Sequence, residues 1–253
     1  MTNYNKLKLA QATALFGTIL TLLFAFNLTL LLIGLLIGWI MWGLGLTISL
    51  HRYSSHKSFT VTNKIIQYIL LWCGTVITMG SAINFAAGHR QHHKFSDTNK
   101  DPYDITGSLW HKIKLFFFWF PVHNINPLVI KDLIKDPAHN FFNRHYWKIL
   151  LIYPIILLLI NPILFGYFYA LPVTYVLLGM GYVTVLAHLP CLHKYGTVDY
   201  ITGDNSWNSK LIGHILVGEG NHNMHHALPG KWNYSLNSDK LDIPAKIINI
   251  IKD

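Results

Sequence analysis

The sequence predicts an all-α membrane protein in which four transmembrane helices form two hairpins, with a re-entrant or interfacial segment and a cytoplasmic helical cap that carries clusters of histidine. Of the 253 residues, 52% are hydrophobic and only 12% are charged, a composition typical of membrane proteins. Two long stretches contain no Asp, Glu, Lys or Arg, and eight of the fifteen histidines fall into three clusters. We expect a single membrane domain over residues 1–253.

The first uncharged stretch covers residues 10–50 and is long enough for two membrane-spanning helices. A spanning helix needs about 20 apolar residues. We therefore expect spans at about 10–26 and 30–50, joined by a tight turn near residues 27–29.

The second uncharged stretch covers residues 149–193 and fits two more spans. We expect the turn between them around Asn161 to Gly166, where Pro162 and Gly166 interrupt the apolar pattern. We place these spans at about 149–166 and 169–188.

The basic residues indicate the orientation of the spans. Both predicted hairpin tips are uncharged, and the Lys and Arg residues that flank the spans all lie at the opposite ends. These residues are Lys6, Lys8, Arg52, Lys57, Arg90, Lys94, Lys148 and Lys194. Because positive residues mark the cytoplasmic face, we expect a multi-pass integral membrane protein whose termini and histidine clusters are cytoplasmic.

Two further apolar segments are not expected to cross the membrane. Residues 65–88 are long enough to cross, but a crossing would put the histidines before and after them on opposite sides. We therefore predict a re-entrant or interfacial segment, which Gln67, Ser81 and Asn84 make less costly. The aromatic run at residues 115–121 is too short to span and predicts a helix in the headgroup region.

The histidine clusters predict a metal site. They are His51 and His56; His89, His92 and His93; and His222, His225 and His226. In H-x-x-H-H the imidazoles lie at i, i+3 and i+4, so each triplet presents three nitrogens to one side of a helix. His51 and His56, five residues apart, lie on different faces of an ideal helix, so they either bridge two metals or lie where the helix unwinds.

More imidazoles converge than one metal can bind, so the clusters indicate a dinuclear centre. The chain has a single glutamate, Glu219, which excludes the carboxylate-rich centre of soluble di-iron bundles. The isolated histidines are expected to be interfacial or hydrogen-bonded rather than ligands. They are His111, His123, His139, His145 and His214.

The remaining composition sets simple limits. Cys73 and Cys191 imply no disulfide framework and suit a reducing cytoplasm. The net charge of +9 fits the positive-inside orientation and contact with anionic lipid. A more specific role is a landing surface for a phosphate-bearing substrate or an acidic electron carrier. Nucleic-acid binding is not indicated.

With their flanks, the clusters resemble the three histidine boxes of the integral-membrane fatty acid desaturases, specifically the stearoyl-CoA (Δ9) desaturase type. The similar segments are His51-Arg-Tyr-Ser-Ser-His-Lys-Ser-Phe59, His89-Arg-Gln-His-His-Lys-Phe-Ser-Asp97 continuing to Asp101-Pro102, Asp204-Asn-Ser-Trp-Asn208, and Gly218-Glu-Gly-Asn-His-Asn-Met-His-His226. The resemblance extends over residues 30–230, most of the chain.

The resemblance implies nine histidine ligands, of which the eight clustered residues match directly. The ninth lies at the cytoplasmic end of the last span, where His188 and His193 are both candidates. We favour His188, because placing His193 at the helix end would put Pro190 inside the span. The family asparagine four residues before the ligand is absent in either case, since Thr184 or Leu189 stands there.

The resemblance also implies side chains that hold the imidazoles in place. The candidates lie within or beside the matched motifs, and no catalytic residue is expected beyond the metal ligands. The candidates are Asp97, Asp101, Asp204, Glu219, Asn208 and Thr184. Asn221 stands where the family has an aromatic residue.

The activity implied is an O2-dependent acyl desaturase that uses two iron ions to introduce a cis double bond at Δ9. Zinc has no redox chemistry, and ligand type alone would also admit copper or nickel, so iron is inferred by resemblance. The acyl chain is carried on coenzyme A, acyl carrier protein or a membrane lipid. No cytochrome b5 or ferredoxin segment is recognisable, so we expect a separate donor of that kind with its reductase.

A dry tunnel should hold the acyl chain below the irons. Trp39, Trp42, Trp72 and Gly43 are candidates to line it, and the alternative is that they only pack or face lipid. Two other functions are compatible with the clusters. The first is a fatty acyl hydroxylase or conjugase on the same scaffold. The second is a histidine-rich metal transporter, disfavoured because transporters bind near the bilayer midplane.

Overall fold

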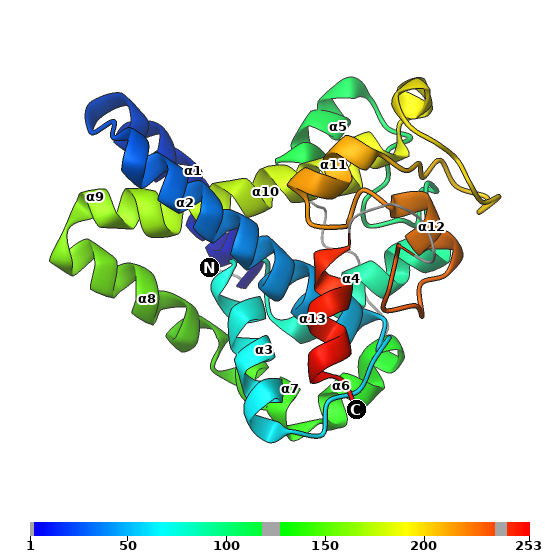
Figure 1. Ribbon diagram of the computed structural model, residues 1–253, viewed down its shortest axis with the longest axis horizontal. Coiled ribbons are helices and arrows are strands. Elements are labelled where there is room, and N and C mark those ends of the chain that lie inside the picture. The colour runs from blue at the N-terminus through cyan, green and yellow to red at the C-terminus, as the bar shows by residue number, and fades with distance from the viewer. Residues whose placement is uncertain (1–2, 118–126, 236–241) are drawn as a thin grey trace.

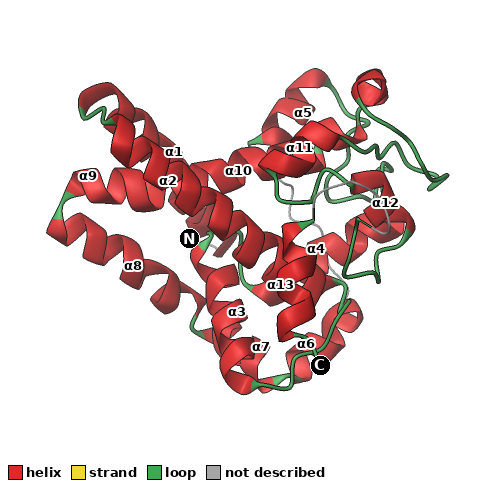
Figure 2. Cartoon of the chain, in the orientation of Figure 1, coloured by secondary structure: helices red, strands yellow, loops and turns green. Residues whose placement is uncertain are grey.

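The computed structural model describes residues 3–117, 127–235 and 242–253, and this part of the chain contains helices and no strand (Figure 2). The predicted all-α class is therefore confirmed for the described residues. The α-helices are α1 Asn3–Phe24, α2 Leu28–Met41, α3 Lys64–Val76, α4 Ala82–Phe95, α5 Leu109–Phe116, α6 Lys131–Lys135, α7 Pro137–Arg144, α8 Tyr146–Ile160, α9 Pro162–Phe165, α10 Leu171–Thr184, α11 Lys210–Ile215, α12 His222–Ala227 and α13 Ile243–Ile251.

Helices with other winding extend some of these elements. The π-helix η1, Trp42–Ser55, continues α2, and the π-helix η3, Gly166–Ala170, joins α9 to α10. Three 3₁₀-helices complete the set: η2 Pro127–Ile130, η4 Leu186–His188 and η5 Pro190–Tyr195.

Within the described ranges, three continuous helices are long and apolar enough to cross a membrane. They are Asn3–Phe24, Leu28–Ser55 and Pro162–His188, whereas α8 is apolar but has only 15 residues. The two pairs α1–α2 and α8–α9 project to one side of the molecule, and the short helices gather on the other (Figure 1). The length and apolar surface of these helices indicate association with a membrane.

Asparagine caps fix both turns between paired helices. Asn27 accepts a hydrogen bond from the backbone N–H of Leu30, and Asn161 accepts one from Ile163. The second turn therefore falls at Asn161, at the start of the segment that the sequence indicated. The expected boundaries of 166 and 169 are wrong, because Gly166 continues the helix instead of ending it.

The segment at residues 65–88 is folded back on itself. α3 ends at Val76, and a tight turn with Thr78 and Gly80 at positive φ leads into α4, whose first turn is capped by Ser81. The histidines on either side of the segment consequently meet, with His56 Nε2 2.8 Å from His89 Nε2. The two ends of the segment therefore lie side by side.

Two glycines allow α2 to pack closely against the helix that contains α10. Gly34 and Gly38 form a G-x-x-x-G pair, a spacing that lets membrane helices approach. A Cβ at Gly34 would lie 2.4 Å from the carbonyl oxygen of Tyr167, and one at Gly38 would lie 2.9 Å from Tyr175 Cβ. This packing matters for the site, because α2 leads into His51 and α10 leads into His188.

The predicted interfacial helix is described only in part. α5 begins before it, at Leu109, and ends at Phe116, with Leu109 and Trp110 largely exposed. Residues 118–121 of the predicted run lie outside the described residues.

We predict that Gly34→Ala destabilises the protein, because its methyl group overlaps the Tyr167 carbonyl and overpacking costs about 1–3 kcal/mol. The expected result is a lower melting temperature in detergent. Gly43→Ala is the matched control on the same continuous helix, since its Cβ would meet Val217 at an ordinary 3.6 Å. Equal melting temperatures for the two variants would contradict this close packing.

Candidate metal centre

Nine buried or half-buried histidines converge in two adjacent groups. The first, called here the five-histidine group, contains His51, His56, His89, His93 and His225. The second, the four-histidine group, contains His92, His188, His222 and His226. Within each group the ligand nitrogens lie within 4.8 Å of one another. Ligands about 2.1 Å from an ion span about 4.2 Å, so each group has the size of one coordination sphere.

The π-helix η1 brings His51 and His56 into the same group. The backbone N–H of His56 donates to the carbonyl of His51 at 3.1 Å, the i to i+5 bond that defines this winding. Residues five apart therefore stack on one face instead of diverging. Of the two alternatives expected for these histidines, the helix does unwind here, into π winding that ends at His56, and the two residues fall in one group instead of bridging two.

Each H-x-x-H-H triplet is divided between the two groups. On α4, His89 and His93 join the five-histidine group and His92 joins the other. On α12, His222 and His226 share one group and His225 belongs to the other. The i and i+4 residues lie about 40° apart around a helix, and i+3 points away from i+4 by about 100°. Because α4 and α12 each lie between the two groups, each supplies histidines to both. The expectation that each triplet presents its three nitrogens to one side is therefore wrong.

The structure distinguishes the two candidates for the ninth histidine. His188 is fully buried, and its Nε2 lies 2.9 Å from His222 Nε2. His193 belongs to neither group, and its Nε2 lies 2.9 Å from the carbonyl oxygen of Asn205.

Four carboxylates accept hydrogen bonds from the Nδ1 atoms of four of these histidines. The distances are 3.2 Å for His51 to Glu219, 2.9 Å for His92 to Asp101, 3.3 Å for His188 to Asp97, and 2.7 Å for His226 to Asp204. A carboxylate on Nδ1 fixes the tautomer, so Nε2 carries the free lone pair. The arrangement leaves these histidines ready to bind metal through Nε2.

Two of these carboxylates are themselves held by the loops that carry them. The Asp101 carboxylate accepts hydrogen bonds from the backbone N–H groups of Asp97 and Tyr103 at 2.9 and 2.8 Å. Burial raises the pKa of Asp204, but its hydrogen bond to His226 and the charge there outweigh burial and hold this pKa well below its usual value. Asp204 therefore remains an ionised acceptor at neutral pH.

Asn208 and Thr184 do not contact a ligand imidazole directly. Asn208 Oδ1 accepts the backbone N–H groups of Asn223 and Met224 at 2.9 and 3.3 Å, which holds the first turn of α12. Thr184 is buried, and its hydroxyl donates to the carbonyl of Met180 at 2.7 Å. Asn221 is buried directly before His222.

The chemistry of the groups fits bound metal. His188 and His51 donate from Nδ1 to carboxylates, so their Nε2 lone pairs face His222 and His225 at 2.9 and 3.0 Å. The buried His226 Nε2 has no hydrogen-bond partner. Facing lone pairs repel unless a cation lies between them, and an all-imidazole set suits a divalent transition metal.

The protonation of the imidazoles agrees with this fit. Burial lowers the pKa of His89, His93 and His225 well below the ordinary value, and the neighbouring histidines lower it further. Neutral imidazoles keep the lone pairs that metal binding requires.

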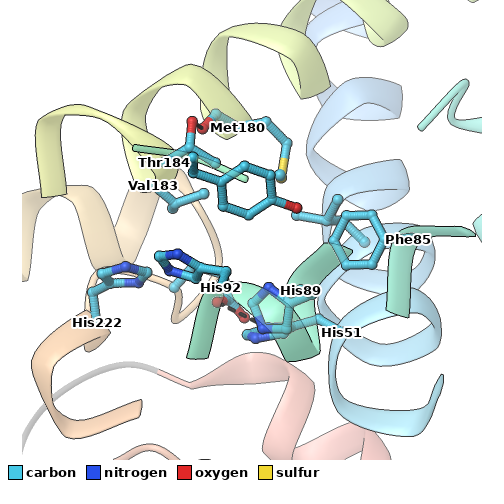
Figure 3. A pocket seen from close by; sticks show the side chains of 11 residues that line it. His51, Phe85, His89, His92, Met180, Val183, Thr184 and His222 are labelled. Carbon is cyan, nitrogen blue, oxygen red and sulfur yellow. Dashed lines mark hydrogen bonds and ion pairs between the residues drawn. The ribbon is translucent and has the colours of Figure 1, made fainter. Parts of the chain in front are cut away.

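A pocket reaches both histidine groups from the apolar side (Figure 3). Its histidines are His51 and His89 from one group and His92 and His222 from the other. The opposite wall is formed by Leu46, Phe85, Tyr103, Met180, Val183 and Thr184. The pocket therefore borders both groups at once, and its lining opposite the histidines is largely apolar.

The four expected tunnel residues do not line this pocket. Trp42 is fully buried and donates from Nε1 to the Leu216 carbonyl at 2.8 Å, while Trp39 is half-buried. Trp72 is 49% exposed, and Gly43 is buried. Packing and lipid contact account for these residues.

The isolated histidines lie outside both groups, and His123 falls outside the described residues. His139 is buried between Ser54, 3.1 Å from its Nε2, and Asp136, which accepts from its Nδ1. His214 is exposed, and His111 Nε2 lies 2.9 Å from the Asp104 carbonyl. Both cysteines are free.

Sequence reasoning missed three buried neighbours of the site. Arg52, Tyr234 and Asp242 lie together beside His51 and His225. Arg52 stands within the first histidine box, which was the one available signal. Tyr234 and Asp242 come after the last box, where no motif pointed to them.

Comparison with known proteins agrees with the resemblance. Residues 25–238 match the family model for fatty acid desaturases. The chain is 31% identical over 224 residues to an sn-1 stearoyl-lipid 9-desaturase of Anabaena variabilis, covering 87% of this chain and 79% of that protein. It is 30% identical over 257 residues to Delta-9 acyl-lipid desaturase 1 of Arabidopsis thaliana, covering 98% and 82%.

A further relative is a probable acyl-CoA desaturase of Schizosaccharomyces pombe. It is 31% identical over 214 residues, and the match covers 81% of this chain and 43% of that protein. The matched family region contains all three histidine boxes. The chain therefore belongs to the fatty acid desaturase family, and it is an oxidoreductase that desaturates fatty acyl chains.

Proposed function

We propose that this desaturase introduces a cis double bond at the Δ9 position of a saturated, lipid-linked acyl chain. The observation that carries the proposal is the pair of all-histidine groups that border one apolar pocket. The names of the Anabaena and Arabidopsis relatives support the Δ9 position and a lipid carrier. Acyl-CoA, in the name of the yeast relative, and acyl carrier protein are the alternative carriers.

The nine histidines would hold two iron ions, five on one and four on the other. Bound iron would supply the O2 activation and the oxidising power needed to remove two hydrogen atoms from an alkyl chain. The ligands are His51, His56, His89, His92, His93, His188, His222, His225 and His226. Asp97, Asp101, Asp204 and Glu219 would orient four of these imidazoles through Nδ1.

The protein would hold the acyl chain with its reacting carbons between the two groups. Phe85, Met180 and Val183 supply an apolar wall that excludes water from this position. Two electrons would come from a separate carrier such as ferredoxin or cytochrome b5 with its reductase. An acidic carrier suits the basic surface near His56 and His93, where Lys57 and Lys94 are exposed.

We also propose the membrane arrangement. The four spans are α1, the helix Leu28–Ser55, α8 with the turn at Asn161, and the helix Pro162–His188. The chain is one membrane domain over residues 1–253, with both termini and the metal centre at the cytoplasmic face. Contact between the histidines at the ends of three different segments supports this arrangement, because they must share one side.

The first prediction concerns the ninth ligand. His188→Ala removes an imidazole from the four-histidine group, so desaturation should fall to background. His193→Ala should keep most activity, because His193 contacts only the Asn205 carbonyl. Fatty acids are measured by gas chromatography after expression in a desaturase-deficient host.

The control for these variants is His214→Ala, an exposed histidine outside both groups. His139 is unsuitable, because it is buried and hydrogen-bonded. An inactive His193→Ala together with an active His188→Ala would transfer the ninth position to His193.

The second prediction concerns the product. Stearate or palmitate in membrane lipids should lose two hydrogen atoms at Δ9, and the unsaturated chain should appear in glycerolipids when acyl-CoA is not supplied. Mass spectrometry of each separated lipid class identifies the acyl carrier, the length of the acyl chain and the position of the double bond. A product heavier by one oxygen atom would instead identify a hydroxylase.

The third prediction concerns orientation. Cys73 and Cys191 are replaced by serine, and single cysteines are then introduced elsewhere. A membrane-impermeant thiol reagent, added to one side of the membrane at a time, shows which side each cysteine faces. Lys57→Cys, Asn99→Cys and Lys231→Cys should all react from the cytoplasm. Phe26→Cys and Ile160→Cys, at the two hairpin turns, should react only from the opposite side. Reaction of Asn99→Cys from that opposite side would be incompatible with a shared centre.

A further inference from the structure

A buried cation lies directly beside the five-histidine group. The side chain of Arg52, the residue after His51, is fully buried. Its Nη1 donates to both carboxylate oxygens of Asp242 at 2.9 and 3.0 Å and to the Trp232 carbonyl at 2.7 Å. The guanidinium also lies 3.9 Å from the centre of the Tyr234 ring. Arg52 is therefore held by the C-terminal part of the chain.

Arg52 reaches the ligands by two routes. Its Nη2 lies 3.6 Å from Oε1 of Glu219, whose other oxygen accepts from His51 Nδ1 at 3.2 Å. The Tyr234 ring beneath it lies 4.9 Å from the His225 ring and 6.1 Å from the His51 ring. Both routes end on the five-histidine group and neither reaches the four-histidine group.

Asp242 pairs with Arg52, and this pairing leaves Glu219 to face His51. Arg52 brings one positive charge, and Asp242 and Glu219 bring two negative charges, one of which faces His51. All three side chains are buried, and an unpaired buried charge is costly. Without the Asp242 charge, Arg52 would draw Glu219 toward itself and away from His51 Nδ1.

The local backbone is built around Asp242. Its carboxylate accepts the backbone N–H groups of Tyr234 at 2.7 Å and Ala245 at 3.1 Å, and the latter contact caps α13. Gly218, next to Glu219, has φ of +101°, and a Cβ there would lie 2.9 Å from Asp242 Oδ1. The turn that carries Glu219 is thus shaped to lie against Asp242.

α13 packs against η1, the helix that contains Arg52. Ile248 of α13 shares a buried cluster with Ile48 of η1, one turn before Arg52. The helix begins at Ile243, beyond the residues 25–238 that the family model matches.

We propose that Asp242 is a positioning residue for the metal ion bound by the five-histidine group. It holds Arg52, so that Glu219 is free to accept from His51 Nδ1 and keep His51 Nε2 aimed at the ion. The C-terminal helix is then part of the metal-binding scaffold. The proposal rests on the proposed function, because it concerns the affinity of one of the two ions.

The test measures iron bound per folded chain in purified protein. Asp242→Asn keeps the size and one acceptor oxygen but removes the charge. Loss of such an orienting contact lowers metal affinity by roughly 10–100-fold. At iron concentrations that just saturate the wild type, the variant should retain the ion of the four-histidine group and lose most of the other. Asp204→Asn is the matched variant, because it should instead weaken the ion held through His226.

Two further variants separate positioning from general structural damage. The double variant Arg52→Gln with Asp242→Asn also removes the guanidinium that would otherwise draw Glu219 away. Glu219 should then keep its contact with His51 Nδ1, and the iron content should be higher than that of Asp242→Asn alone. The combination of Asp242→Asn with Asp204→Asn should lose both ions. Asp253→Asn, at an exposed residue near α13, should bind as the wild type does.

The outcomes discriminate clearly. Loss of one ion from Asp242→Asn with recovery in the double variant supports the proposal. Wild-type binding by Asp242→Asn, equal loss of both ions, or no recovery in the Arg52→Gln double variant would overturn it while leaving the proposed function intact. A wild-type protein that binds fewer than two ions would overturn the proposed function and, with it, this proposal.

Discussion

Imidazole nitrogens that face one another across a buried centre are the constraint on which the rest of the structure depends. His56 and His89 approach to 2.8 Å, and His51 and His225 to 3.0 Å, through atoms that carry lone pairs or compete for one proton. Such contacts need surrounding helices that fix the rings and a cation or a shared proton between the nitrogens. Several features of the fold serve this end, including the π-helical winding at the first box, the folded-back segment before α4 and the carboxylates on Nδ1.

The histidine spacing predicted the chemical type of the site, because box residues and their acidic neighbours are close in sequence. The same local patterns located the long apolar helices. The division of each triplet between two groups was not predictable, since it depends on where α4 and α12 lie relative to other helices. The spacing of His51 and His56 left unwinding open without indicating π winding, and the span boundaries near Asn161 were placed too late because Gly166 was taken as a break.

Long-range contacts explain the remaining differences. Asp242 follows the last box by 16 positions and meets Arg52, 190 residues earlier, so no local motif connects them. His188 and His193 have similar flanks, and only the fold separates a buried imidazole beside His222 from one that meets a loop carbonyl. The four carboxylates suggested by the family motifs do contact imidazoles, whereas Asn208 binds the backbone of α12 and Thr184 that of its own helix.

The proposed dinuclear, all-imidazole centre is tested most directly by X-ray absorption spectroscopy of the iron-loaded wild-type protein, together with its iron content. Two groups of five and four histidines predict about two iron ions per chain and a ligand shell dominated by imidazole scattering, with little carboxylate. One ion per chain, or a shell rich in carboxylate oxygen, would contradict this arrangement, because the carboxylates of the site are engaged on Nδ1 atoms.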